Sequence, residues 1–144
     1  MRKFATFAAI AMLAQAVPAL AQVKGPVSAS SPGGTVSVSL STDGDGRAIY
    51  TVSRKGQPII APSRLGFLFT DAVKLDRRIE VTGTETRDFD ETWTQPWGEW
   101  TSIRNHYREL KVHLRETTAL GRVFAVTFRI YDDGVGFSYE IQKK

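Results

Sequence analysis

The chain has 144 residues, a formal net charge of +4 and no cysteine. A chain of this length can bury enough apolar surface for one domain, and the absence of cysteine excludes stabilisation by disulfide bonds. Its basic residues form no stripe with interleaved aromatic residues, so the composition argues against a nucleic-acid-binding protein.

The first 21 residues predict a secretory signal peptide with a helical apolar segment. Arg2 and Lys3 supply the positively charged start, an apolar run follows, and Ala19-Leu20-Ala21 has the small residues of a cleavage site. The mature chain is expected to begin at Gln22. Because the apolar run is too short to span a bilayer, the sequence predicts an exported protein, periplasmic or secreted, with no membrane contact after cleavage.

Residues 22–34 are rich in Pro, Ser and Gly and are predicted to form a flexible lead-in to a domain that covers residues 35–144. Apolar residues then alternate with polar ones over residues 36–40 and again over 48–52, which is typical of strands buried on one face. The intervening Asp43-Gly44-Asp45-Gly46 favours a turn. These features predict a β-hairpin.

The next part of the chain predicts shorter strands. Pro58 and Pro62 bracket an apolar stretch that fits an edge strand, because proline cannot donate to a central ladder. Residues 65–69 alternate as another strand would, and residues 79–81 suggest a short one.

The last third of the chain has the clearest strand pattern. Apolar and charged residues alternate over 109–115, and alternating segments over 124–130 and 135–141 are joined by Asp132-Asp133-Gly134. No window has convincing helical periodicity, so the mature chain is predicted to be all-β, an antiparallel β-sandwich. The final segment lacks any feature that protects a sheet edge, and the sandwich is therefore expected to be incomplete, with a missing continuation.

Residues 90–100 gather three tryptophans and three carboxylates around a Pro-Trp-Gly turn. Pro96 and Gly98 are incompatible with a plain central strand or a helix, so the aromatic residues are expected to pack against something irregular. One fitting partner is a sugar, whose C–H face stacks on an indole while its hydroxyls bond to carboxylates and amides; the other is a neighbouring protein domain. Glu99 is the stronger candidate carboxylate, because the turn would fix its direction.

Two acidic motifs fall short of the chemistry they suggest. The Asp43–Gly46 segment begins like a calcium loop, but Arg47 and Arg54 occupy positions that need oxygen ligands, which favours a simple turn. Glu91 and Glu99 are the residue types of a glycosidase acid and base, yet such pairs usually come from separate strand ends of a large scaffold.

The two histidines do not define a site. His106 lies between Asn105 and Tyr107 and is interpreted either as a contact to a sugar or carboxylate, or as a hydrogen-bonded structural residue. His113 is predicted to lie on the wet face of its strand. With no ligand spacing suited to zinc and no nucleophile motif, the chain is predicted to contain no metal site and no catalytic residue.

A set of motifs occurs in a defined order: Pro62-Ser63-Arg64-Leu65-Gly66, Glu91-Thr92-Trp93, Gln95-Pro96-Trp97-Gly98-Glu99, Arg104-Asn105-His106-Tyr107, Glu109-Leu110 and Phe128-Arg129-Ile130-Tyr131-Asp132-Asp133-Gly134-Val135. Over roughly residues 30–141 this order resembles the N-terminal domain of glycoside hydrolase family 97, a family of exported bacterial α-glucosidases and α-galactosidases.

The resemblance implies a galactose-mutarotase-like super-sandwich followed by a (β/α)8 barrel that hydrolyses α-linked oligosaccharides, with a calcium ion in its active site. The catalytic carboxylates and most calcium ligands of such enzymes belong to the barrel, so no catalytic residue is carried over and no cofactor is expected in this chain alone. A supporting role, at the domain contact or the rim of the sugar pocket, is implied for Trp93, Gln95, Trp97, Glu99, Asn105 and His106.

We therefore predict the truncated N-terminal, carbohydrate-binding-type sandwich of an exported α-glycosidase, which is not hydrolytic without its C-terminal catalytic barrel. One alternative is a free-standing sugar-binding module in which Trp93, Trp97 and Trp100 form a stacking platform. Another is an interaction domain for a separately encoded barrel, whose binding would pair the open last strand.

Overall fold

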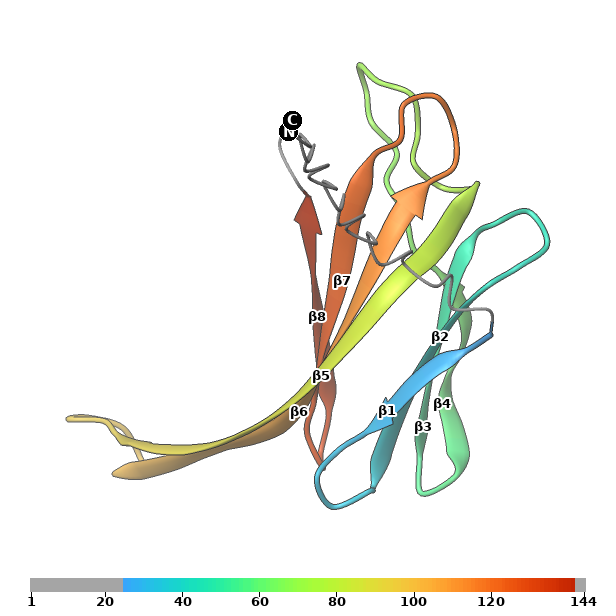
Figure 1. Cartoon of the computed structure of the whole chain (residues 1–144). Coiled ribbons are helices and arrows are strands. Elements are labelled where there is room, and N and C mark those ends of the chain that lie inside the picture. Colours follow the sequence, from blue (N-terminus) through green and yellow to red (C-terminus); the bar gives the residue numbers. More distant parts are fainter. Residues whose placement is uncertain (1–24, 142–144) are drawn as a thin grey trace, which may run out of the picture.

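The computed structural model describes residues 25–141, and the predicted signal peptide over residues 1–21 lies outside this range. The described chain consists of two four-stranded antiparallel sheets, with no helix, packed face to face (Figure 1). The prediction of an all-β antiparallel sandwich is thus confirmed. Within the described residues no helix is long and apolar enough to cross a membrane.

The first sheet has the strand order β1-β2-β3-β4. Its strands are β1 (Val27–Ser30), β2 (Val36–Thr42), β3 (Ala48–Arg54) and β4 (Gln57–Arg64). The predicted hairpin is β2–β3, and its turn is closed by the Asp43 carboxylate, which accepts hydrogen bonds from the backbone N–H groups of Asp45 and Arg47. The proline-bracketed stretch forms β4, at the edge of the sheet as predicted.

Strand β1 corrects the prediction of a flexible lead-in over residues 22–34. Its four residues pair with residues 37–40 of β2, and Val27 and Ala29 pack against the core. The Pro, Ser and Gly content of the segment concealed two apolar residues at strand spacing, and these provide enough burial to hold an edge strand.

The second sheet has the order β5-β6-β7-β8 and consists of β5 (Ile79–Thr94), β6 (Ser102–Glu116), β7 (Val123–Ile130) and β8 (Val135–Ile141). Strands β5 and β6 pair from Ile79 and Glu116 to Thr94 and Ser102, with one irregularity between Val81 and Gly83. The short strand expected at residues 79–81 is therefore only the beginning of a 16-residue strand.

The strand expected over residues 65–69 is not present. This segment belongs to a long connection between β4 and β5, in which one isolated bridge joins Phe67 to Leu75. Leu65 and Leu75 are buried, so the alternation reflects side chains that cover the end of the sandwich and not a paired strand.

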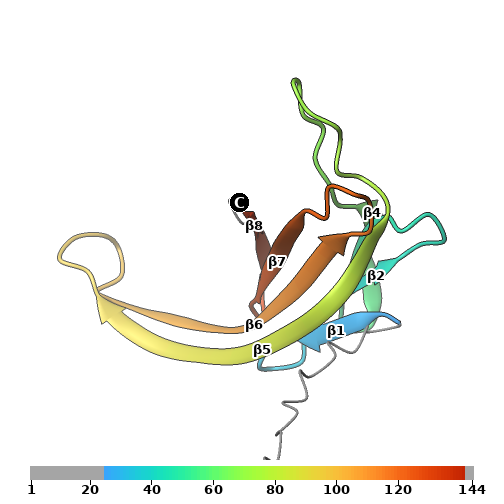
Figure 2. The same ribbon diagram turned by 45° about the horizontal axis from the view of Figure 1, so that its top comes forward.

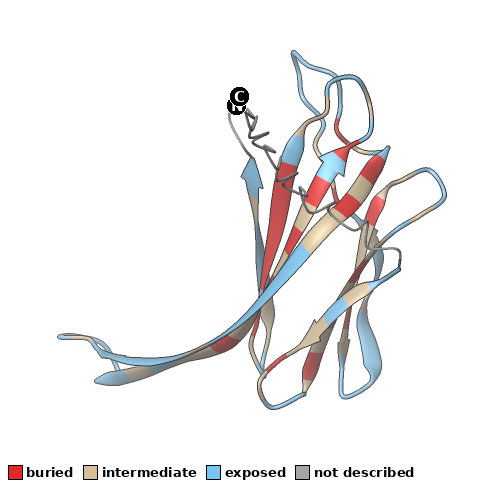
Figure 3. Cartoon of the chain, in the orientation of Figure 1, coloured by how far each residue is buried: buried red, intermediate tan, exposed pale blue. Residues whose placement is uncertain are grey.

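The core lies between the two sheets and is filled by their inward-facing residues (Figure 3). The largest fully buried side chains include Leu40 and Val52 of the first sheet and Leu110, Phe124 and Phe128 of the second. This core fixes the position of β6 and, through it, of the long hairpin that β6 forms with β5.

That hairpin extends well beyond the sandwich. Strand β7 pairs with β6 only from Arg108 onward, so residues 102–107 of β6 have β5 as their one strand neighbour. We call this two-stranded ribbon, residues 89–107, the arm. Figures 1 and 2 show that the arm is bowed, with strands β1–β4 on its convex side and its concave side facing away from them.

Candidate functional site: the β5–β6 arm

Strand alternation gives the arm two different faces. Residues that pair directly across an antiparallel ladder lie on the same face. Phe89, Glu91 and Trp93 therefore share one face with their partners Tyr107, Asn105 and Ile103. This aromatic face continues the outer, concave side of the second sheet, because the alternate β6 residues Leu110, Val112 and Leu114 point into the core.

Tyr107 is the centre of the aromatic face and is only 4% exposed. Its ring stacks on Phe89, with centroids 4.7 Å apart and planes 13° apart, and packs against Tyr131 at 5.1 Å. The Arg129 guanidinium lies 5.4 Å from the centroid of the same ring. Burial raises the pKa of the Tyr107 hydroxyl. These contacts join the base of the arm to β7 and to the turn that follows it.

A hydrogen-bond chain runs outward from this cluster. The Tyr131 hydroxyl donates to Asn105 Oδ1 at 3.2 Å, and Asn105 Nδ2 donates to Glu91 Oε1 at 2.7 Å. Glu91 itself is exposed, and Trp93, two residues further along the same face, is 49% exposed. The chain therefore ends in an oriented carboxylate beside an accessible indole.

The opposite face is charged. Arg108 donates two hydrogen bonds to Asp88, at 2.6 and 3.1 Å, and Arg104 donates two to Asp90, both at 2.7 Å. These hydrogen bonds hold the pKa of both carboxyl groups below the ordinary value. His106 pairs with Asp90 across the ladder on this face. Exposed ion pairs of this kind contribute little to stability, but their two-pronged geometry stiffens the ribbon.

The tip of the arm is a loop over residues 95–101 that is braced by Gln95. The Gln95 side-chain amide donates to the Trp100 carbonyl oxygen at 2.7 Å, and its backbone N–H donates to the Thr101 carbonyl oxygen at 3.1 Å. Gly98 has a φ of 128° and lies so close to the Gln95 amide that a Cβ there would be 2.5 Å from Nε2. The loop holds Trp97 83% exposed and Trp100 72% exposed.

A comparison with protein families identifies the domain. The family described as "Glycosyl-hydrolase 97 N-terminal" matches residues 29–144. The chain belongs to this family. The family 97 resemblance seen in the sequence motifs is therefore confirmed.

Relatives of this family 97 N-terminal domain are much longer proteins. A curated relative described as a probable retaining alpha-galactosidase, from Streptomyces bingchenggensis (strain BCW-1), is 30% identical over 121 residues, which cover 84% of this chain and 18% of the relative. A glycoside hydrolase family 97 enzyme from Pseudoalteromonas sp. strain K8, solved with acarbose and, as an E480Q variant, with panose, is 28% identical with a TM-score of 0.77. That match covers 82% of this chain and 18% of the enzyme.

A third solved structure, a beta-arabinopyranosidase, shares the fold at 22% identity and a TM-score of 0.72, again over 82% of this chain and 18% of the other. The family 97 domain described here thus spans about 18% of the length of the relatives that it matches.

The structure distributes the six predicted site residues over three places on the domain. Trp93 and Asn105 lie on the aromatic face, whereas His106 lies on the charged face, because adjacent residues of a strand point to opposite sides. Trp97 and Glu99 are exposed on the tip, and Gln95 is used to brace it. The six residues therefore do not form a single cluster.

Trp93, Trp97 and Trp100 are 49%, 83% and 72% exposed, so their packing against a sugar or a neighbouring domain stays a prediction. The predicted site also left out four residues of the aromatic face, Phe89, Glu91, Tyr107 and Tyr131, although Glu91 had been weighed as a catalytic carboxylate. The first three carried a usable signal, since Phe89, Glu91 and Trp93 on one strand and Ile103, Asn105 and Tyr107 on the other alternate at strand spacing. Reading residues 90–100 as one loop concealed this pattern.

No metal site is evident in the described part of the domain, where no group of three or more His, Asp or Glu side chains could hold an ion. In the acidic turn, the Asp43 carboxylate already accepts hydrogen bonds from the backbone N–H groups of Asp45 and Arg47, and the Arg47 guanidinium lies 2.7 Å from the Asp45 carboxylate. The turn therefore does not fit a calcium loop, as the sequence indicated, and the calcium ion that the resemblance implies for the barrel stays an expectation.

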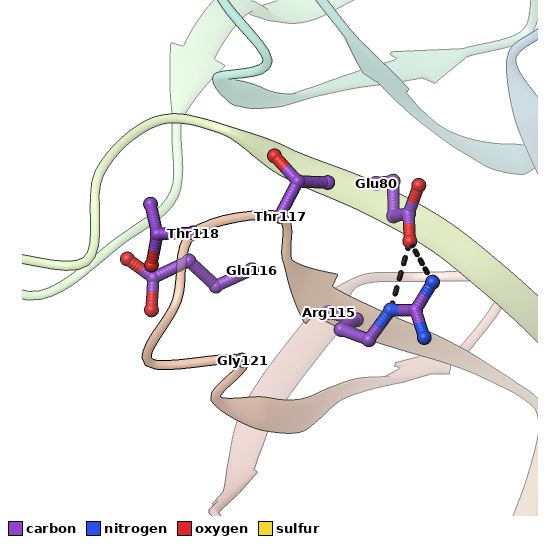
Figure 4. Close-up of a pocket in the computed structure, with 6 residues that line it drawn as sticks. All are labelled: Glu80, Arg115, Glu116, Thr117, Thr118 and Gly121. Atoms are coloured by element: carbon purple, nitrogen blue, oxygen red, sulfur yellow. Dashed lines mark hydrogen bonds and ion pairs between the residues drawn. The ribbon is translucent and has the colours of Figure 1, made fainter.

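One cavity among the described residues lies away from the arm. It is shallow, with a volume of about 340 Å³, and at the start of β5 and the end of β6 it is lined by Glu80, Arg115, Glu116, Thr117, Thr118 and Gly121 (Figure 4). The Glu80 carboxylate accepts a hydrogen bond from Arg115 there, at 2.8 Å from Nε. Because this cavity lies at the opposite end of the β5–β6 ladder from the tip, it does not form part of the aromatic site.

Proposed function

We propose that this chain is the N-terminal sandwich of an exported α-glycosidase and that its arm supports the active site of a catalytic barrel that acts on α-linked oligosaccharides. The observation that carries the proposal is the arm itself, a braced ribbon that holds two largely exposed tryptophans away from the sandwich. Indole rings held in water mark a surface that is covered by a ligand or a partner, because burial of such rings dominates interface energetics.

The arm is built to keep a fixed shape. A two-stranded ribbon is marginally stable in water by itself. Here the Tyr107 cluster anchors the base, two Arg–Asp pairs stiffen one face, and Gln95 braces the tip. Such preorganisation lowers the entropic cost of docking against a rigid neighbour.

The resolved pKa shifts of the described carboxyl groups give no support to an independent hydrolase. A glycosidase needs a protonated carboxylic acid, whose pKa is raised, opposite a second carboxylate. Within residues 25–141, every carboxyl group whose pKa departs from its ordinary value is lowered. These groups are Asp43, Asp76, Glu85, Asp88, Asp90, Glu116, Asp132 and Glu140. In the proposal, the acid, its partner and the calcium ion belong to the barrel.

The relatives support the substrate class. The Pseudoalteromonas enzyme has been solved with acarbose and panose, and the Streptomyces relative is described as an alpha-galactosidase. We extend this class, an oligosaccharide with an α-linked unit, to the enzyme that contains the present domain.

The test has two parts. Reading the gene past the codon for Lys144 should reveal an open frame with alternating strand and helix patterns of a barrel, or a neighbouring gene that encodes one. The purified mature chain should not hydrolyse nitrophenyl α-glucosides or α-galactosides. A chain that hydrolyses either substrate, and loses this activity on Glu99→Gln substitution, would show that the domain is itself the enzyme.

A further inference from the structure

We propose that the aromatic face of the arm is a binding site for one pyranose unit, with Trp93 stacking on the C–H face of the ring and the Glu91 carboxylate accepting hydrogen bonds from its hydroxyls. The inference rests on the proposed function and gives it a location that differs from the tip loop.

The Glu91 side chain is held in a fixed orientation. This side chain is exposed, yet Asn105 holds its Oε1 at 2.7 Å, and the Tyr131 hydroxyl holds Asn105 in turn. Tyr131 follows β7 and packs against Tyr107, so the chain fixes the carboxylate relative to the body of the domain. In the described residues no further donor bonds to Glu91, and its other lone pairs remain available to a ligand.

Polar and apolar residue pairs alternate along the aromatic face. Glu91 and Asn105 form a polar rung between two apolar rungs, Phe89 with Tyr107 and Trp93 with Ile103. Successive rungs on one face are about 7 Å apart, which is comparable to the width of a sugar ring with its substituents. A pyranose has apolar C–H faces and polar edges, so it can contact the indole and the carboxylate together.

The arm is bowed, and its concave side faces away from the first sheet (Figure 2). Strand alternation from the core-facing Leu110 places the aromatic face on the side away from the first sheet, and Trp93 is 49% exposed there. A ligand on this side would contact the aromatic face of the arm without displacing any strand of the sandwich.

The hydrogen-bond chain does more than stabilise the ribbon. The Arg–Asp pairs on the charged face already connect the strands over the same stretch, at Arg104 with Asp90 and at Arg108 with Asp88. An exposed cross-strand pair adds little to this, whereas an oriented carboxylate lowers the cost of binding a polar ligand.

The tip offers a poorer combination. Trp97 and Trp100 present apolar area, but the amide of Gln95 is bonded to the Trp100 carbonyl oxygen. Glu99 is exposed and has no hydrogen bond from the described residues. The tip therefore has stacking surfaces without a fixed carboxylate, which suits a protein contact better than sugar selection.

The experiment is a titration of the mature chain with panose, followed by amide chemical shifts. One stacked ring and a few hydrogen bonds predict a Kd on the order of millimolar. Trp93→Ala and Glu91→Gln should each weaken binding about tenfold, and Trp93→Tyr should retain most of it. Trp97→Ala and Glu99→Gln are the matched controls at the tip and should change the Kd less than about twofold.

Thermal unfolding of each variant checks that the sandwich remains folded. The inference is overturned if the tip variants abolish binding while Trp93→Ala retains it, or if panose at about 50 mM causes no saturable shift. Either result leaves the proposed function standing, since the presence of a barrel and its activity are read from the gene and the hydrolysis assay.

Discussion

Replacing Tyr107 by alanine should detach the arm from the sandwich. Truncating a buried aromatic side chain to alanine costs about 3–5 kcal/mol. The two ring contacts, to Phe89 and Tyr131, account for about 1–3 kcal/mol of stabilisation beyond buried area. The arm lies outside the sandwich, so its backbone can partly fill the space that the Tyr107 side chain leaves. We therefore expect the lower end of this range, a loss of about 3 kcal/mol in the free energy of unfolding.

The three tryptophans of the chain make this loss measurable, because Trp93, Trp97 and Trp100 all lie in the arm. In urea, tryptophan fluorescence reports the arm, whereas circular dichroism reports mainly the two sheets. Tyr107→Ala should move the fluorescence transition to lower urea and separate it from the circular dichroism transition. Tyr107→Phe keeps the ring and should leave both transitions nearly unchanged.

Coincident transitions in Tyr107→Ala, displaced by less than about 1 kcal/mol, would refute the reasoning. Such a result would mean that the ladder hydrogen bonds and ion pairs suffice to hold the arm without the aromatic cluster.

Three further predictions concern the sandwich and the tip. Arg122→Ala removes the hydrogen-bond partner of Glu116, which is only 4% exposed. The free energy of unfolding measured in urea at pH 7 should fall by about 3 kcal/mol, and a loss below about 1 kcal/mol would contradict this. Hydrogen bonds from Arg122 lower the pKa of Glu116 below its ordinary 4.5, so their contribution is present above pH 4.5 and disappears as pH falls through the lowered value. The melting temperature should fall on acidification below pH 4.5, and the Arg122→Ala deficit should shrink there; an unchanged deficit would oppose the assignment. Gly98→Ala would place a Cβ 2.5 Å from the Gln95 amide nitrogen. It should therefore shift the tryptophan emission spectrum without moving the circular dichroism transition, and an identical spectrum would exclude a bracing role for Gln95.

The parts of the fold that the sequence predicted are those in which one strand face is buried. The alternation at β2, β3, β6 and β7 reports burial against the core directly, whereas edge strand β8 alternates although Phe137 and Ile141 are exposed. β1 was missed because only two of its four residues are apolar, and the Leu65 segment was misread because side chains that cover the end of a sandwich also alternate.

The candidate site was harder to predict because the arm is a strand pair outside the sandwich. Its register brings Glu91 opposite Asn105 and Phe89 opposite Tyr107, across a loop whose length the sequence does not reveal. Gln95 illustrates the same difficulty, since its amide type suited a sugar contact, but the loop geometry directs it to a backbone carbonyl. Residue types were therefore predictable, while their grouping required the register.

The most direct test of the account shortens the arm in the enzyme that the proposed function predicts, namely this domain together with its catalytic barrel. Asp90 and His106 already face each other across the ladder, so an Asn-Gly turn can replace residues 91–105 while the Tyr107 cluster is retained. The account predicts a folded enzyme with an unchanged sandwich transition and a kcat/KM for panose reduced by at least about tenfold. Full activity in the shortened enzyme would contradict the claim that the arm supports the active site.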